Sequence, residues 1–222
     1  MSENITVIRR RESVLANNAV LRNTYLLLSL TLLFSALTAT LAMLNNAPPI
    51  NPFITLIGYF GLLFLTTRLR NSPWGLVSIF ALTGFMGYTL GPILNIYMQH
   101  VHNGHQIVVT SLGATGSIFL SLSAIALITK KDFSFMGGFL AIGVLVAFFI
   151  SLAAVLFHLP AAMLAASAMF IFLCSGIILF KTSQIIHGGE TNYIMATIDL
   201  YVSLYNIFIS LLSLLGGSNS RD

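Results

Sequence analysis

The chain has 222 residues, of which 57% are hydrophobic and only 7% are charged. A soluble domain normally carries about 25% charged residues, so this composition excludes a water-soluble globular protein. The net charge of +4 is spread between apolar runs and is not gathered into a basic groove, and we therefore expect no nucleic-acid partner.

Seven apolar stretches predict seven transmembrane helices, because about 20 residues rising about 1.5 Å each are needed to cross the bilayer. The stretches are 24–44, 52–67, 74–98, 106–129, 135–157, 161–180 and 192–215. Asparagine, glycine and proline residues mark the turns between them. The predicted fold is an all-α membrane protein, a seven-transmembrane-helix bundle at 23–217. A basic N-terminal tail at 1–22 precedes it, and a short C-terminal tail at 218–222 follows.

The cationic residues predict the orientation of the bundle. With seven spans, nine of the ten lysine and arginine residues fall on one side, and only Arg221 falls on the other. The positive-inside rule then puts the N-terminus in the cytoplasm and the C-terminus outside. The nine are Arg9, Arg10, Arg11, Arg22, Arg68, Arg70, Lys130, Lys131 and Lys181.

Small residues in the stretch 74–98 predict a close approach between helices. Gly84, Gly87 and Gly91 recur there, and the last two have the GxxxG spacing that lets helix backbones pack closely in lipid. Pro92 follows directly, and a proline removes one helix hydrogen bond. A hinge at this point is therefore the alternative to close packing.

Lys181 and Asp199 are predicted to form an intramembrane ion pair. The last two apolar stretches are joined by a short polar turn, so their helices should be antiparallel neighbours. If the sixth helix continues to His187, both residues lie about 10 Å from the turn. An unpaired charge there would cost several kcal/mol, and pairing removes much of that cost. The pair has two possible roles, a structural lock or an ion or proton path.

Other polar residues near the pair give weaker signals. Ser203 and Asn206 lie on the same helical stripe as Asp199 and can hydrogen-bond to neighbouring helices. Glu190 is a loop charge or an acid at a helix N-terminus, where the helix dipole favours it, and a contribution to a cation site is the alternative.

No residue pattern predicts catalysis, a cofactor or a metal site. The histidines, the single Cys174 and the serines form no nucleophile–base arrangement, and no nucleotide-binding motif occurs. Three histidines, His100, His102 and His105, cluster in one connection. A polar loop is favoured over a metal site there because no carboxylate or cysteine lies nearby to complete the ligands. We therefore expect no enzyme.

Several segments also resemble a known family. The segments 75–78 and 87–94 resemble the motif of the Bax inhibitor (transmembrane Bax-inhibitor-motif) family, and 186–193 and 200–208 are similar to its last helix hairpin. The segments 21–25, 91–95 and 187–193 are similar to its bacterial YccA-like branch. The family-matched hairpin positions include Glu190, Asn192, Tyr193, Ser203 and Asn206.

The resemblance implies a seven-helix bundle with its last helix near the centre. Some family members are described as pH-sensitive calcium leaks that use an aspartate pair, but the matching positions here are Lys181 and Ser203, and neither is an acid. The YccA-like branch implies a multi-pass protein of the bacterial inner membrane, with its C-terminus in the periplasm. Such a protein would bind and modulate the membrane-anchored AAA protease FtsH in membrane-protein quality control.

Three functions follow from these observations as expectations. The first is modulation of FtsH, for which the N-terminal tail with Arg9, Arg10 and Arg11 would serve as a handle for the protease. Contact of these arginines with anionic lipid is the alternative role for the tail. The second function is a cation or proton leak through the bundle, and the third is a structural partner without transport activity.

Overall fold

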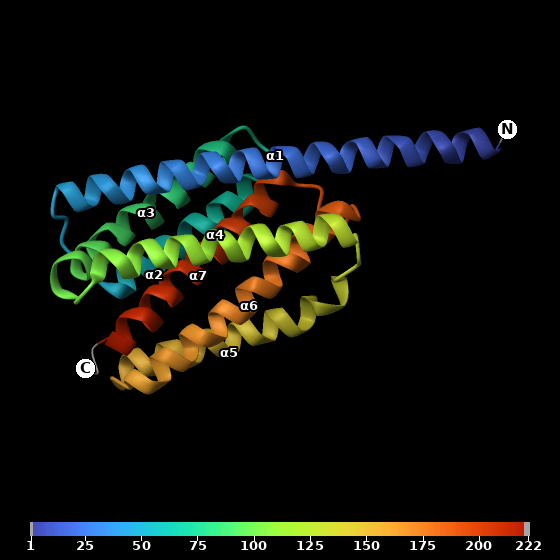
Figure 1. Ribbon diagram of the computed structural model, residues 1–222. Helices are drawn as coiled ribbons and strands as arrows, with labels where there is room; N and C mark the ends of the chain where they lie inside the picture. The colour runs from blue at the N-terminus through green and yellow to red at the C-terminus, as the bar shows by residue number, and fades with distance from the viewer. Residues whose placement is uncertain (1, 220–222) are drawn as a thin grey trace.

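The computed structural model describes the backbone of residues 2–219 and the side chains of residues 17–217. Within this part the chain is an antiparallel bundle of seven long helices, and each is long and apolar enough to span a membrane (Figure 1). The predicted all-α, seven-span architecture is confirmed. The elements are α1 (Ser2–Leu44), α2 (Pro52–Leu69), α3 (Trp74–His100), α4 (Gly104–Thr129), a 3-10 turn η1 (Ser134–Met136), α5 (Gly137–Leu156), α6 (Pro160–Ile186) and α7 (Tyr193–Asn219).

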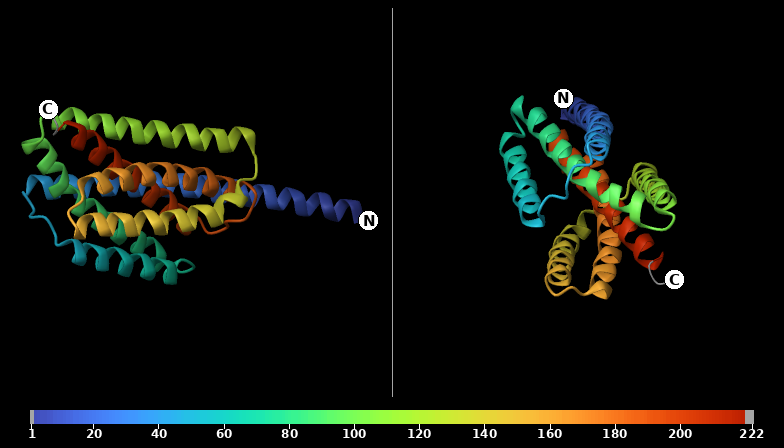
Figure 2. Two further views of the ribbon diagram at one scale, coloured as in Figure 1. Left: turned by 90° about the horizontal axis from the view of Figure 1, so that it is seen from below. Right: turned by 90° about the vertical axis from the view of Figure 1, so that its left-hand side faces the viewer.

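The first helix is much longer than its apolar stretch. It runs without a break from Ser2 to Leu44, although the apolar stretch that is long enough to span the membrane begins only at Thr24. Residues 2–22 contain no glycine or proline, so nothing in the sequence ends the helix there. Its N-terminal part projects beyond the rest of the bundle (Figures 1 and 2). The predicted tail is therefore helical, and Arg9, Arg10 and Arg11 lie on it, with side chains outside the described part.

The last helix runs through the middle of the bundle, as the view along the bundle shows (Figure 2). The spans of α3 and α7 are the most buried within the bundle, at 61% and 50%, whereas only 6% of the α2 span is buried. The N-terminal end of α1 and the C-terminal end of α7 lie at opposite ends of the molecule (Figure 1). Such an arrangement follows from an odd number of antiparallel spans.

The helices α1 and α3 approach closely along a row of glycines on α3. A Cβ atom on Gly87 would overlap the Ser35 carbonyl oxygen, and one on Gly91 would lie 2.5 Å from the Ala42 Cβ. At Gly84 the ring of Phe34 occupies the corresponding space. The missing side chains therefore let the two backbones approach closely. The helix α3 continues through the buried Pro92, and a hinge there stays a prediction.

A buried hydrogen-bond node joins three helices at the centre of the core. The Tyr201 hydroxyl on α7 lies 2.6 Å from the Ser35 hydroxyl on α1 and donates to the Thr83 carbonyl on α3, at 3.3 Å. Because a polar group without a partner is costly in lipid, this node restricts how α7 can slide between α1 and α3. The apolar residues around it include Leu28, Ile79 and Ile198.

Candidate functional site

The α6–α7 hairpin brings Lys181 and Asp199 into direct contact. The Lys181 Nζ lies 2.9 Å from the Asp199 Oδ2, and the two side chains are 20% and 30% exposed. The Lys181 Nζ also lies 5.6 Å from the centre of the neighbouring Phe180 ring, within range of a cation–π attraction. The pair links the two helices about one and a half turns from the end of α6. Its role as a lock or as an ion path stays a prediction.

The predicted polar neighbours of Asp199 on α7, Ser203 and Asn206, do not join the pair. The Ser203 hydroxyl donates to the Asp199 carbonyl at 2.7 Å, and the Asn206 Nδ2 donates to the Val202 carbonyl at 2.8 Å. Both bonds stay within α7, where a hydroxyl or amide is satisfied by the carbonyl one turn back. Ser203 and Asn206, which were expected to hydrogen-bond to neighbouring helices, therefore bond within α7 instead.

The turn between α6 and α7 is built by the residues that carry the family resemblance. Gly188 has φ +75°, a left-handed conformation that ends α6 without the strain a side chain would add. Glu190 accepts a hydrogen bond from the Asn192 backbone N–H at 2.9 Å. The Asn192 Oδ1 accepts from the backbone N–H groups of Ile194 and Met195, at 3.0 and 3.1 Å, and so caps α7.

Asn192 also ties this turn to the one between α2 and α3. Its Nδ2 donates to the Arg70 carbonyl at 3.1 Å and to the Asn71 Oδ1 at 2.9 Å. Nearby, a Cβ on Gly75 would lie 2.9 Å from the Ile194 Cδ1, so the start of α3 packs directly on the start of α7. Tyr193 packs beside Ile194 against the main core cluster. These matched positions hold two connections together.

We expect Asn192→Ala to lower the free energy of unfolding by about 1–2 kcal/mol, because the helix cap and both bonds to the α2–α3 turn are lost. Asn192→Asp keeps the capping oxygen and loses only the amide donors, so its effect should be smaller. Thermal unfolding of both variants in detergent measures the difference. Equal losses in the two variants would contradict the assigned cap.

Sequence reasoning missed a second junction, between α6 and the turn after α4. The Ser183 hydroxyl accepts from the Phe133 backbone N–H at 3.0 Å and donates to the Lys131 carbonyl at 3.1 Å. The His187 Nε2 lies 3.1 Å from the Lys130 carbonyl oxygen. In the same turn, hydrogen bonds from the side chain and backbone of Ser134 lower the pKa of Asp132. The α4–α5 turn is thus fastened to α6.

These junctions gather three connections at one end of the bundle, where α1 extends outward. The α1 residue Asn17 joins them, because its Nδ2 donates to the Ile186 carbonyl at 3.1 Å. The cations Arg68, Arg70, Lys130 and Lys131 belong to this end, which is therefore the basic end of the molecule.

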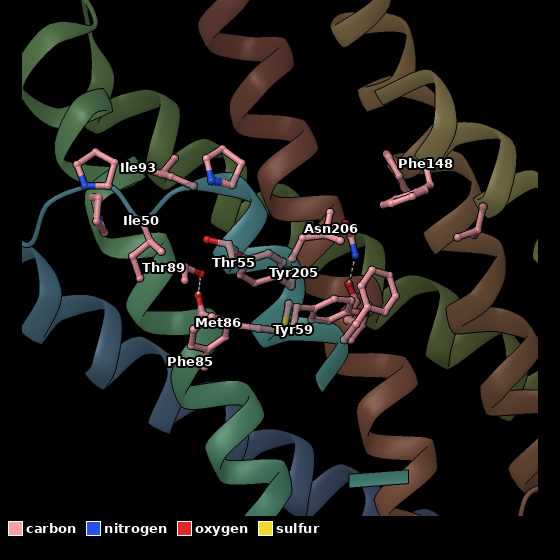
Figure 3. Close-up of a pocket in the computed structure, with 18 of the residues that line it drawn as sticks. Ile50, Thr55, Tyr59, Phe85, Met86, Thr89, Ile93, Phe148, Tyr205 and Asn206 are labelled. Atoms are coloured by element: carbon pink, nitrogen blue, oxygen red, sulfur yellow. Dashed lines mark hydrogen bonds between the residues drawn. The ribbon is translucent and has the colours of Figure 1, made fainter. Parts of the chain in front are cut away.

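At the other end the structure contains a groove that the sequence did not reveal. It has a volume of about 720 Å³ and is lined by residues of α2, α3, α5 and α7, with Phe170 of α6 (Figure 3). Its inner side includes Tyr205 and Asn206 of the central helix. Its position depends on how far α2 and α5 diverge, which no local pattern encodes.

The described side chains form no cluster that could bind a metal ion. No three histidine, cysteine, aspartate or glutamate side chains of residues 17–217 approach closely enough to hold a metal ion together. Cys174 is buried in α6 as a free thiol.

Comparison with known proteins places this bundle in a family. The family model described as inhibitor of apoptosis-promoting Bax1 matches residues 17–221. The chain is 53% identical to the Modulator of FtsH protease YccA of Escherichia coli strain K12 over 212 residues, 96% of this chain and 95% of that protein. A relative from E. coli O6:H1, the Inner membrane protein YccA, is equally similar over the same shares. An uncharacterized protein of Pseudomonas aeruginosa is 53% identical over 92% of each chain. The chain belongs to the Bax inhibitor family, in its bacterial YccA-like branch.

Proposed function

We propose that this protein modulates the membrane-anchored protease FtsH in the bacterial inner membrane. The observation that carries the proposal is the 53% identity, over nearly the whole of both chains, to a protein named for that activity. The structure supports it through two features, a helix that projects from the basic end of the bundle and a bundle fastened against extraction.

The basic end is proposed to face the cytoplasm. The cations of the α2–α3 and α4–α5 connections and of the projecting α1 helix lie at this end, and the positive-inside rule assigns such an end to the cytoplasmic side. The C-terminal end of α7 then faces the periplasm, because the termini lie at opposite ends (Figure 1). An ATP-driven protease with cytoplasmic catalytic domains would meet the projecting helix first.

The projecting part of α1 is suited to serve as a handle. The backbone of its first turns lies apart from the other helices, as both views show (Figures 1 and 2). A helix without tertiary contacts is easily unwound, since most helical stability in proteins comes from packing. Pulling on it transmits force directly into the α1 span, which packs along α3.

Resistance to that pulling would let the protein occupy the protease. Extraction of α1 must separate it from the glycine row of α3 and break the Ser35–Tyr201 bond. It must also remove the Asn17 contact with the end of α6. Slow extraction would keep FtsH engaged and reduce its action on other membrane proteins.

The predicted leak is supported less well. Asp199 is engaged by Lys181, and among the described residues no second carboxylate is paired with it. A selective cation site normally needs several oxygen ligands. The third candidate function is a structural partner without transport activity. The experiment below distinguishes it from modulation of FtsH.

The handle is tested by deleting residues 2–12, which leaves Asn17 and its contact with α6 in place. With purified FtsH and ATP in proteoliposomes, we expect the shortened protein to be degraded more slowly than the full chain. It should also interfere less with the degradation of a second membrane substrate, because the protease has no free segment to grip.

A matched variant distinguishes the effect of the length of the projecting helix from the effect of its charge. Arg9, Arg10 and Arg11 replaced by glutamine keep the length of the handle but lose its positive charge, so degradation should stay close to that of the full chain. If the deletion leaves both turnover and co-purification with FtsH unchanged, the handle is refuted. If the full chain never alters degradation of the second substrate, modulation itself fails.

A further inference from the structure

The groove between α2, α3, α5 and α7 suggests a ligand-binding site that is independent of protease binding. We propose that it binds one acyl chain of a phospholipid from the leaflet that contains the α1–α2 connection. The groove would be a built lipid site within the bundle, distinct from the general lipid contact of the outer helix faces.

The lining of the groove matches an acyl chain in chemistry. Among the described residues that line it, none carries a charge, and most are aliphatic or aromatic. Two of its polar side chains are hydrogen-bonded within their own helices: Thr89 donates to the Met86 carbonyl at 2.8 Å and Asn206 to the Val202 carbonyl at 2.8 Å (Figure 3). A ligand therefore meets a mainly apolar surface.

The position of the groove in the bundle indicates which leaflet would supply the acyl chain. It runs from Pro52 to Phe60 along α2, about 12 Å at the rise of a helix, and from Phe85 to Ile96 along α3, about 17 Å, and so covers about half of a bilayer about 30 Å thick. Its rim residues Leu145 and Phe149 are 57% and 62% exposed on a helix that spans the membrane. The open side of the groove therefore faces the hydrocarbon chains of one leaflet.

The size of the groove favours a chain over a protein helix. A transmembrane helix about 10 Å wide displaces roughly 1,300 Å³ over three turns. The groove holds about 720 Å³ and is crossed by an edge-to-face contact of Phe60 with Phe148, whose ring centres are 6.3 Å apart. A single file of methylene groups can pass beside these rings, whereas a helix cannot enter without moving α2 from α5. The volume lies within the range of about 300–1,000 Å³ typical of ligand pockets.

The absence of charge in the lining gives the proposal a further consequence. Because no described lining residue can pair with a phosphate, binding should depend on the acyl chain and be insensitive to the headgroup. Phosphatidylglycerol and phosphatidylethanolamine should compete equally for the groove.

The test uses the full chain in nanodiscs that contain a phospholipid with a diazirine in the middle of one acyl chain. After illumination, labelled peptides are mapped by mass spectrometry. Ile57 and Phe64, on the outer face of α2 at 72% and 74% exposure, report contact with bulk lipid. Label on the α7 segment around Val202 and Tyr205 requires that a chain enter the groove.

Two groove-filling variants and one control decide the outcome. Val144→Trp on α5 and Ile93→Trp on α3 place a large ring in the groove from opposite walls, and both should abolish labelling of α7 while labelling of α2 persists. Val146→Trp is the matched control, because Val146 is 44% exposed on α5 and does not line the groove. It should leave α7 labelling intact.

The proposal is overturned by any of three results. They are no α7 labelling in the unaltered protein, α7 labelling that survives both filling variants, or a strong preference for one headgroup. A photoreactive residue in place of Phe149 tests whether a protein occupies the groove instead of a lipid. If it yields adducts with a second copy or another membrane protein and none with lipid, the groove is a protein-binding surface.

Discussion

Gly87→Leu should lower the free energy of unfolding by about 3 kcal/mol, the upper part of the range for overpacking a filled site. The clash is with the Ser35 carbonyl and the Thr38 side chain, and a backbone carbonyl cannot move aside as a flexible side chain can. The α1 and α3 helices would have to separate. Such a separation also weakens the Ser35–Tyr201 bond at the centre of the bundle.

Gly113→Leu on α4 is the matched control. A Cβ atom at Gly113 meets nothing within 4 Å, so a leucine there points into open lipid and should be neutral or slightly stabilising. Thermal unfolding in detergent, followed by the loss of the monodisperse species, measures both variants. Equal destabilisation by the two leucines would show that the glycine row does not hold α1 against α3.

The same pair of variants links packing to the proposed function. If FtsH is slowed because α1 resists removal from α3, Gly87→Leu should be degraded faster than the unaltered chain, whereas Gly113→Leu should not. A faster turnover of Gly87→Leu without loss of interference toward a second substrate would contradict occupation of the protease as the mechanism.

The helices themselves could be predicted because each apolar stretch is bounded by turn-forming residues. The full length of a helix could not be predicted where the helix continues through polar residues, because they leave no apolar signal. The first helix extends to Ser2 through polar residues, since no glycine or proline stops it. The sixth apolar stretch ends at Phe180, and the helix continues to Ile186, close to the end at His187 that was assumed for the depth of Lys181, with Thr182 and Ser183 fully buried. Hydroxyl side chains are buried there because other segments supply their partners.

The site was predictable only where sequence neighbours form it. The depth of Lys181 and Asp199 follows from a single short turn, so helix rise alone places them together. The contact of His187 with the Lys130 carbonyl and the groove beside Phe148 depend on which distant helices are neighbours. Seven antiparallel spans allow many neighbour arrangements, and local patterns do not choose among them.

Asp199→Asn should lower the free energy of unfolding by about 2–3 kcal/mol, because it leaves the Lys181 charge without its partner inside the bundle. The loss is expected to be smaller than for a fully buried pair, since both side chains are partly exposed and lysine can reach toward the membrane surface. Lys131→Met, which removes an exposed cation at the same end, should change stability by less than about 1 kcal/mol.

The double variant Lys181→Met with Asp199→Leu distinguishes the two roles of the pair. If the pair is a lock, removal of both charges should restore most of the stability lost in Asp199→Asn, because no unpaired charge remains in lipid. Function toward FtsH should then return with stability. If the pair is an ion path, proteoliposomes should show pH-dependent flux that disappears in Asp199→Asn and stays absent in the stable double variant. Recovery of interference with FtsH in a protein that lacks both charges would therefore assign the pair to holding α6 against α7.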